Sequence, residues 1–171
     1  LPVNHQIHLT ELRPSDKSAF VTHLNDDDIY KGTLRIPAPY TEADAESFLE
    51  FDAQATEQHG HPVHFAIRNS ENVVLGCCGF DEINYGHRAE IGYWLAKPYW
   101  GQGIMTEVVR ATCEFAMTDW KLVRISAHVF DFNRASARVL EKNGFEYEGF
   151  LQKHHRKAGQ FVDSKLFAKV K

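Results

Sequence analysis

Residues 88–107 read Arg-Ala-Glu-Ile-Gly-Tyr-Trp-Leu-Ala-Lys-Pro-Tyr-Trp-Gly-Gln-Gly-Ile-Met-Thr-Glu, and this segment is the most informative part of the chain. In its first half, Ile91, Tyr93 and Leu95 alternate with smaller or amphipathic residues, which is typical of a β-strand. Pro98 ends that strand because proline has no backbone N–H to donate to a neighbouring strand. Apolar residues at helical spacing follow the second glycine. The stretch therefore predicts a strand, a glycine loop and a helix in succession.

The glycine loop lies directly before the first turn of the expected helix. Gly101 and Gly103 let a ligand approach the backbone closely, because glycine has no Cβ. The first N–H groups of a helix have no partner inside the helix, and the helix dipole is positive at that end. These properties together suit a pyrophosphate ligand.

Three kinds of phosphate-binding loop compete for this pattern. A Walker loop needs Gly-Lys-Ser/Thr after four spacer residues, and the chain has no such run. A dinucleotide-binding fingerprint is nearly met by Gly101, Gly103 and Thr106, with Asp131 as the acidic residue expected roughly 20 positions later. That fingerprint usually opens its domain, whereas here two expected strands precede it. The third kind of loop fits best.

Residues 99–107 resemble the acetyl-CoA pyrophosphate loop of the GNAT acetyltransferase superfamily, in the form found in its RimJ/RimL-like branch. Residues 89–95 resemble that branch's central strand, and residues 133–145 resemble its Asn-x-x-Ser helix that ends in Gly-Phe. The superfamily's usual loop is Gln/Arg-x-x-Gly-x-Gly/Ala, but here Trp100 and Met105 hold its first and last positions. This departure removes a charged contact to phosphate and leaves that binding mainly to backbone N–H groups.

The resemblance implies an α+β GNAT-like fold over residues 1–171 as a single domain, with a mixed, mostly antiparallel sheet of about seven strands and helices on both faces. It implies transfer of the acetyl group of acetyl-CoA to a primary amine, by direct attack within a ternary complex. The acceptor would be a protein N-terminus or a small-molecule amine. A non-catalytic acyl-CoA sensor and, less favoured, a dinucleotide-dependent oxidoreductase remain as alternatives.

Direct attack on a thioester needs a neutral amine, so a group must accept the amine's proton. Glu90, in the central strand, is the first candidate for this base, and Glu82, at the end of the preceding strand, is the second. The plain alternative for Glu90 is a solvent-facing residue or an ion pair with Arg88. The separation of the two carboxylates cannot be read from the sequence.

The expected helix at 133–142 supplies two further candidates. The resemblance implies that Asn133 holds the pantetheine or the substrate, and this role is compatible with capping the helix. The resemblance also implies that Ser136 is the general acid toward the leaving thiolate, and the alternative is an ordinary first-turn residue. The expected acetyl-CoA contacts come from the strand end, the loop and this helix start: Trp94, Leu95, Gln102, Gly103, Ile104, Met105, Thr106 and Asn133.

Histidines attract attention in two places. The spacing His59-x-His61-x-x-His64 fits no standard zinc pattern, so no metal is expected. His154 and His155 are neighbours in an expected strand, where successive side chains point to opposite faces. We interpret them as surface histidines, with a position of one of them at the acceptor site as the alternative.

The composition bounds the remaining possibilities. The chain has 171 residues, of which 43% are hydrophobic and 25% charged, as in an ordinary globular domain. A net charge of −4 without a basic block disfavours nucleic acid as a partner. No run of about 18 apolar residues and no signal peptide is visible, so no membrane partner is expected. Adjacent Cys77 and Cys78 cannot pair across a strand, which favours a reducing, cytoplasmic location. A homodimer stays open, and a chain beginning at Leu1 indicates a missing native N-terminus.

The periodicity along the chain predicts strands at 5–13, 64–68, 73–81, 89–96 and 122–129, a closing hairpin of 147–155 and 161–170, and helices at 14–24, 41–58, 102–118 and 133–142. Residues 25–28 are interpreted as a solvated turn or a helix start.

Overall fold

The computed structural model describes residues 1–171. Its strands are β1 (Ile7–Thr10), β2 (His64–Asn69), β3 (Val74–Asn84), β4 (Arg88–Leu95), β5 (Arg124–Phe130), β6 (Glu146–Lys157) and β7 (Gln160–Val170). Its helices are α1 (Lys17–Leu24), α2 (Asp27–Gly32), α3 (Glu42–His59), α4 (Ile104–Asp119) and α5 (Arg134–Lys142), with short 3-10 turns η1 (Pro14–Asp16) and η2 (Lys97–Tyr99). No helix is long and apolar enough to cross a bilayer.

The strands form a seven-stranded sheet in the order β1-β2-β3-β4-β5-β7-β6. The β4–β5 pair is parallel, whereas β1–β2, β2–β3, β5–β7 and β6–β7 are antiparallel. The prediction of a mixed, mostly antiparallel α+β sheet is therefore confirmed. The chain forms two compact units, one from residues 1–79 and 93–104 and the other from 80–92 and 105–171.

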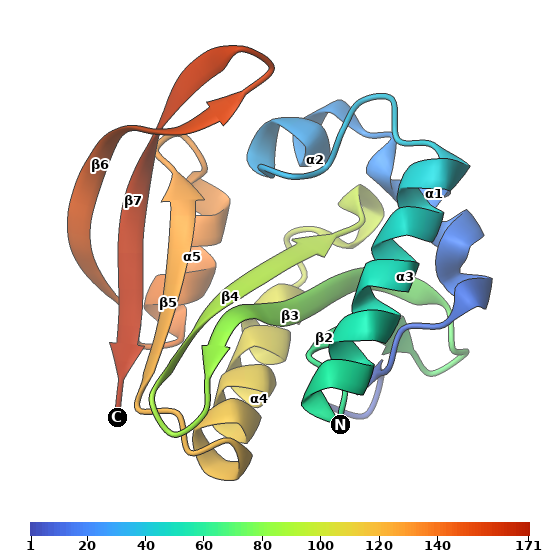
Figure 1. Ribbon diagram of the computed structural model, residues 1–171, viewed down its shortest axis with the longest axis horizontal. Coiled ribbons are helices and arrows are strands. Elements are labelled where there is room, and N and C mark those ends of the chain that lie inside the picture. The colour runs from blue at the N-terminus through green and yellow to red at the C-terminus, as the bar shows by residue number, and fades with distance from the viewer. The chain divides into compact units, whose positions relative to one another are not determined.

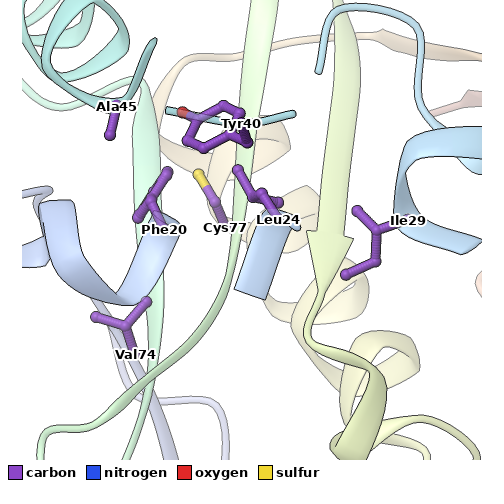
Figure 2. Packing of buried hydrophobic residues seen from close by; sticks show 7 residues of the cluster. All are labelled: Phe20, Leu24, Ile29, Tyr40, Ala45, Val74 and Cys77. Carbon is purple, nitrogen blue, oxygen red and sulfur yellow. The ribbon is translucent and has the colours of Figure 1, made fainter. Parts of the chain in front are cut away.

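The first unit is built around an apolar cluster that α1, α2 and α3 supply together with β3 (Figure 2). Its buried members are Phe20, Leu24, Ile29, Tyr40, Ala45, Val74 and Cys77. Helices α1 and α3 lie side by side in this unit (Figure 1). Burial of this apolar surface is the main favourable contribution to the stability of the unit.

Helix α3 confirms the helix predicted at 41–58, and a capping box defines its N-terminus. Thr41 accepts a hydrogen bond from the backbone N–H of Asp44, and the Asp44 carboxylate accepts one from the backbone N–H of Thr41. This reciprocal arrangement satisfies donors that have no partner inside the helix. Gly60, at φ 75°, ends the helix in a left-handed conformation that glycine adopts without steric cost.

A buried ion pair and a buried histidine–carboxylate contact connect helical segments to β2 in the first unit. The Arg68 guanidinium donates to both carboxylate oxygens of Asp16, at 2.9 and 2.7 Å. Nδ1 of His64 lies 2.9 Å from Oδ1 of Asp52 on α3. Gly79 leaves room for this histidine, because a Cβ at that position would lie 2.4 Å from Cδ2 of His64.

In the second unit, β5 pairs with the first residues of β4 on one side and with β7 on the other. Strands β6 and β7 form a long curved hairpin (Figure 1), as predicted. Helix α4 buries Val108, Val109, Cys113 and Ala116, which are spaced as one helical face.

The structure shortens one expected element and decides between the two alternatives left for another. Strand β1 covers only four residues of the stretch expected at 5–13. Residues 25–28 begin an additional helix, α2, because the Asp26 carboxylate accepts hydrogen bonds from the backbone N–H groups of Asp28 and Ile29. Sequence reasoning had left a turn as the alternative at this position.

Candidate functional site

The strand–loop–helix unit around residues 95–104 has the expected form. Strand β4 ends at Leu95, η2 contains Pro98, and α4 begins at Ile104. Gly101 and Gly103 have φ values of 73° and 80°, in the left-handed region that other residues adopt only at a cost. An added Cβ at either glycine would meet nothing within 4 Å, so the surface above both is open.

Side chains of the loop hold its shape. The indole Nε1 of Trp100 donates to the carbonyl oxygen of Leu95 at 2.6 Å, and the Gln102 amide donates to the carbonyl oxygen of Pro98 at 3.1 Å. Lys97 forms an ion pair with Asp28 at 2.6 Å. The sequence did not indicate this hydrogen bond of Trp100, which occupies the position where the superfamily's usual loop has Gln or Arg.

Trp94 and Leu95 differ in burial. Leu95 is buried, whereas Trp94 is half-buried and meets Phe20 edge to face at a centroid distance of 5.2 Å. The Trp94 side chain therefore packs against the apolar cluster of the first unit. Packing of one side chain does not exclude a contact of the strand's backbone with a ligand.

In the second unit, Glu90 is paired with a histidine that sequence reasoning did not single out. Nδ1 of His128 on β5 lies 3.1 Å from Oε1 of Glu90, and the two side chains are 22% and 30% exposed. The hydrogen bond to Glu90 raises the pKa of His128 above 6.5, although partial burial opposes this shift. One feature of the sequence could have pointed to His128. Ser126 and His128 alternate with apolar residues, so one face of this strand is polar.

An ion pair between Arg88 and Glu90 was the plain alternative for Glu90, but Arg88 instead contacts Glu82. The Arg88 guanidinium lies 3.6 Å from the Glu82 carboxylate, and both side chains are well exposed. Glu82, the second candidate base, therefore lies in a surface ion pair.

The expectation that His154 and His155 point to opposite faces is wrong. The β6–β7 register is interrupted between Leu151 and His155, and Lys153 in this bulge has a φ of 50°. Both rings consequently contact His128, at centroid distances of 5.0 Å for His154 and 5.8 Å for His155. A bulge breaks the alternation of a strand and re-aims its side chains.

The start of α5 shows Asn133 in its capping role. The Asn133 Oδ1 atom accepts a hydrogen bond from the backbone N–H of Ser136 at 3.1 Å, so both candidates lie in the same turn. At the other end of α5, the buried Asn143 amide donates to the carbonyl oxygens of Thr106 at 3.1 Å and Val139 at 2.8 Å. Asn143 thus ties the first turn of α4 to α5, a link that the sequence pattern did not suggest.

A surface groove of about 460 Å³ runs between α5 and the β6–β7 hairpin, lined by Arg134, Ala137, Arg138, Glu141, Tyr147, Lys165 and Phe167. Phe167 and Lys165 alternate with Leu166, the residue that pairs with His128. The groove and the Glu90–His128 pair therefore lie on opposite faces of this part of the sheet.

The other histidine motif has structural partners. His64 pairs with Asp52, and His61 Nδ1 lies 3.1 Å from the carbonyl oxygen of Pro62. No group of three or more His, Cys, Asp or Glu side chains is arranged to hold a metal ion. All three cysteines are buried free thiols.

Comparison with known proteins agrees with this geometry. Residues 6–146 match the family described as the acetyltransferase (GNAT) domain, and the chain belongs to this family. It is 40% identical to the probable N-acetyltransferase YjcK of Bacillus subtilis over 61% of this chain and 60% of that protein. It is 30% identical to the ribosomal-protein-serine acetyltransferase of Escherichia coli over 66% of this chain and 63% of that protein.

A solved structure of RimL, a ribosomal L7/L12 α-N-protein acetyltransferase in complex with coenzyme A, superimposes with a TM-score of 0.87. The match covers 99% of this chain and 96% of that chain at 21% identity, which establishes a common fold. The first three curated relatives are matched over only 56–60% of their own length.

Proposed function

We propose that this protein is an acetyl-CoA-dependent N-acetyltransferase that acts on a primary amine. The observation that carries the proposal is the loop between β4 and α4, where Gly101 and Gly103 adopt left-handed conformations directly before a helix N-terminus. In a member of the GNAT family, this loop is suited to the pyrophosphate of acetyl-CoA.

The proposed acetyl-CoA contacts follow the chain from the strand end into the helix. Backbone N–H groups of residues 102–106 bind the pyrophosphate, with charge complementarity from the helix dipole. The end of β4, at Trp94 and Leu95, offers its backbone to pantetheine, whose amides imitate a β-strand. Asn133 orients the pantetheine arm next to Ser136.

The proposed reaction is direct. A neutral amine nitrogen attacks the thioester carbonyl carbon, a new C–N bond forms, and the C–S bond of the tetrahedral intermediate then breaks. The amine proton passes to the Glu90–His128 pair. The Ser136 hydroxyl hydrogen-bonds the leaving thiolate and passes it a proton, which solvent then replaces. The products are an N-acetyl amide and the free thiol of coenzyme A.

We propose the α-amino group of a peptide or protein as the first acceptor class. Its ordinary pKa near 8 leaves a larger neutral fraction at pH 7 than the pKa near 10.4 of a lysine side chain. Acetyltransferases of ribosomal proteins among the relatives support this order. A small-molecule amine is the second class.

The proposal is tested by mass spectrometry of short peptides and small amines incubated with acetyl-CoA, alongside calorimetry with acetyl-CoA, NADH and ATP. We expect a mass gain of one acetyl group on an amine and binding of acetyl-CoA in preference to the two nucleotides. Acetyl-CoA binding without transfer to any amine would favour the sensor, and NADH binding alone would favour the oxidoreductase.

Gly103→Asp should weaken acetyl-CoA binding about tenfold or more, because it places a carboxylate where the phosphates approach. Gly86→Asp is a matched control, since Gly86 has a similar φ of 75° and equally open surroundings, but lies in the β3–β4 turn. Equal affinities of the two variants would remove the loop from the binding site.

A further inference from the structure

We propose that Nε2 of His128 is the atom that takes the proton from the attacking amine, and that Glu90 acts through His128 as a positioning residue. This inference rests on the proposed function and assigns the proton acceptor within it. It changes the role expected for Glu90 from the base itself to the group that orients the base.

The contact between the two side chains determines which imidazole nitrogen is basic. Nδ1 of His128 faces Oε1 of Glu90 at 3.1 Å, and an ionised carboxylate can only accept a hydrogen bond. The proton of the neutral imidazole therefore resides on Nδ1, and Nε2 carries the free electron pair. A carboxylate that holds a histidine in this tautomer is the arrangement by which imidazoles serve as general bases.

The strand register places the group on one face of the second unit. Glu90 pairs with Ser126 on β5, and His128 is the next residue of β5 on the same face. His128 in turn pairs with Leu166 on β7, while His155 of β6 pairs with Val162, which shares the face of Leu166. The groove beneath α5 lies on the other face, so the imidazole faces away from that helix.

The bulge in β6 holds the imidazole in place. His154 stacks on the His128 ring with an interplanar angle of 20°, and His155 meets the ring edge to face at 86°. Stacking covers the plane of a ring and leaves its in-plane nitrogens accessible from the edge. The His128 side chain is 22% exposed, so part of it faces solvent.

The charges around His128 favour a base that works near neutral pH. Glu90 and, more weakly, Glu82 raise its pKa above 6.5. His154 and His155 contact the His128 ring, while Arg124 and Arg88 lie on the same face in ion pairs with Glu148 and Glu82. Burial, followed by the charges of His154 and His128, lowers the pKa of His155. A general base is most effective when its pKa is close to the working pH.

In the proposed step, the amine nitrogen forms a bond to the carbonyl carbon while its N–H electron pair stays on nitrogen. The released proton binds Nε2, directly or through one water, and gives an imidazolium whose charge the Glu90 carboxylate balances. The imidazolium later returns this proton to solvent. No oxidant or metal is needed.

Two substitutions distinguish the proposed role of His128 as the base from that of Glu90 as its counter-ion. His128→Asn keeps an amide N–H near the position of Nδ1, so it can still hydrogen-bond Glu90, but it has no basic nitrogen. Glu90→Gln keeps an acceptor for Nδ1–H but removes the negative charge. His5→Asn is the matched control, because His5 is exposed and lies in the first unit.

The test is the pH profile of kcat/KM from pH 5 to 9 with one acceptor amine, expressed as the ratio of each variant to wild type so that the amine's own titration cancels. We expect His128→Asn to lower kcat/KM about 100-fold or more near pH 7.5. This variant should also lack the acid limb, the fall in wild-type kcat/KM as the pH drops through the pKa of His128, which lies above 6.5. We expect Glu90→Gln to keep that limb but to move it to lower pH. Nitrogen-15 NMR of the wild type should show His128 protonated on Nδ1 when neutral.

Each other result overturns the assignment in a recognisable way. Wild-type rates in His128→Asn, with the acid limb lost in Glu90→Gln, would make Glu90 the base and leave the proposed function intact. A neutral His128 protonated on Nε2 would also exclude it as the acceptor. A wild-type protein that acetylates no amine would refute the proposed function and, with it, this role of His128.

Discussion

Ser136 lies in the first turn of α5, where its backbone N–H is already bound by the Asn133 side chain. Its hydroxyl is therefore not needed for that cap, and we assign it to the leaving thiolate. We expect Ser136→Ala to keep acetyl-CoA affinity within a few-fold and to slow turnover roughly 10- to 100-fold. The defect should shrink at high pH, because a thiol with an ordinary pKa near 8.5 then leaves more readily as thiolate.

Steady-state kinetics between pH 6.5 and 9, together with calorimetry, checks this expectation. Ser136→Thr is the matched control, since it retains a hydroxyl and should keep most of the activity. Normal turnover in Ser136→Ala would reduce the residue to an ordinary member of the helix and make water the proton source.

At the scale of elements, the bulge of β6 decides where two histidines point. The backbone N–H of Lys153, within the bulge, donates to Oδ1 of Asp163 on β7 at 2.7 Å. A hydrogen bond to a charged acceptor contributes about 1.5 kcal/mol, which corresponds to about tenfold in an equilibrium constant. This single bond thus anchors the segment that carries His154 and His155.

We therefore expect Asp163→Ala to speed amide hydrogen exchange at Lys153 about tenfold and to weaken the ring contacts between His128 and its two neighbours. Two-dimensional NMR measures both effects in the same sample. Asp163→Asn is the control, because its amide oxygen still accepts the hydrogen bond. Unchanged exchange and unchanged imidazole shifts in Asp163→Ala would mean that the strand register alone forms the bulge.

At the scale of the whole molecule, global stability depends strongly on the buried pair of Asp16 and Arg68. Both residues are at most 4% exposed, and the pair connects η1 to β2. Removing one partner of such a pair leaves an uncompensated buried charge. We expect Asp16→Ala to lower the free energy of unfolding by about 3–5 kcal/mol, as measured by urea denaturation.

Glu148→Ala provides the comparison, because it breaks an ion pair with Arg124 at a much more exposed position. We expect a far smaller loss of stability from this change. Similar losses in the free energy of unfolding of the two variants would show that burial does not determine how much an ion pair contributes to the stability of this protein.

Features that depend on short stretches of chain could be predicted from the sequence. The capping box at Thr41, the glycine conformations at 101 and 103, and the capping of α5 by Asn133 each follow from local backbone chemistry. The order of strands and helices, apart from α2, follows from apolar periodicity for the same reason. The single-domain organisation, the homodimer and the cytoplasmic location remain predictions.

Features that depend on partners far apart in the chain could not be predicted. His128 meets Glu90 because β5 lies parallel to β4, and it meets His154 because a bulge shifts the β6 register. Neither register nor bulge leaves a clear mark on a single sequence, since each is selected by packing across the sheet. Local sequence patterns therefore indicate the family, the element order and the glycine loop, whereas the contact of His128 with Glu90 depends on the packing of strands far apart in the chain.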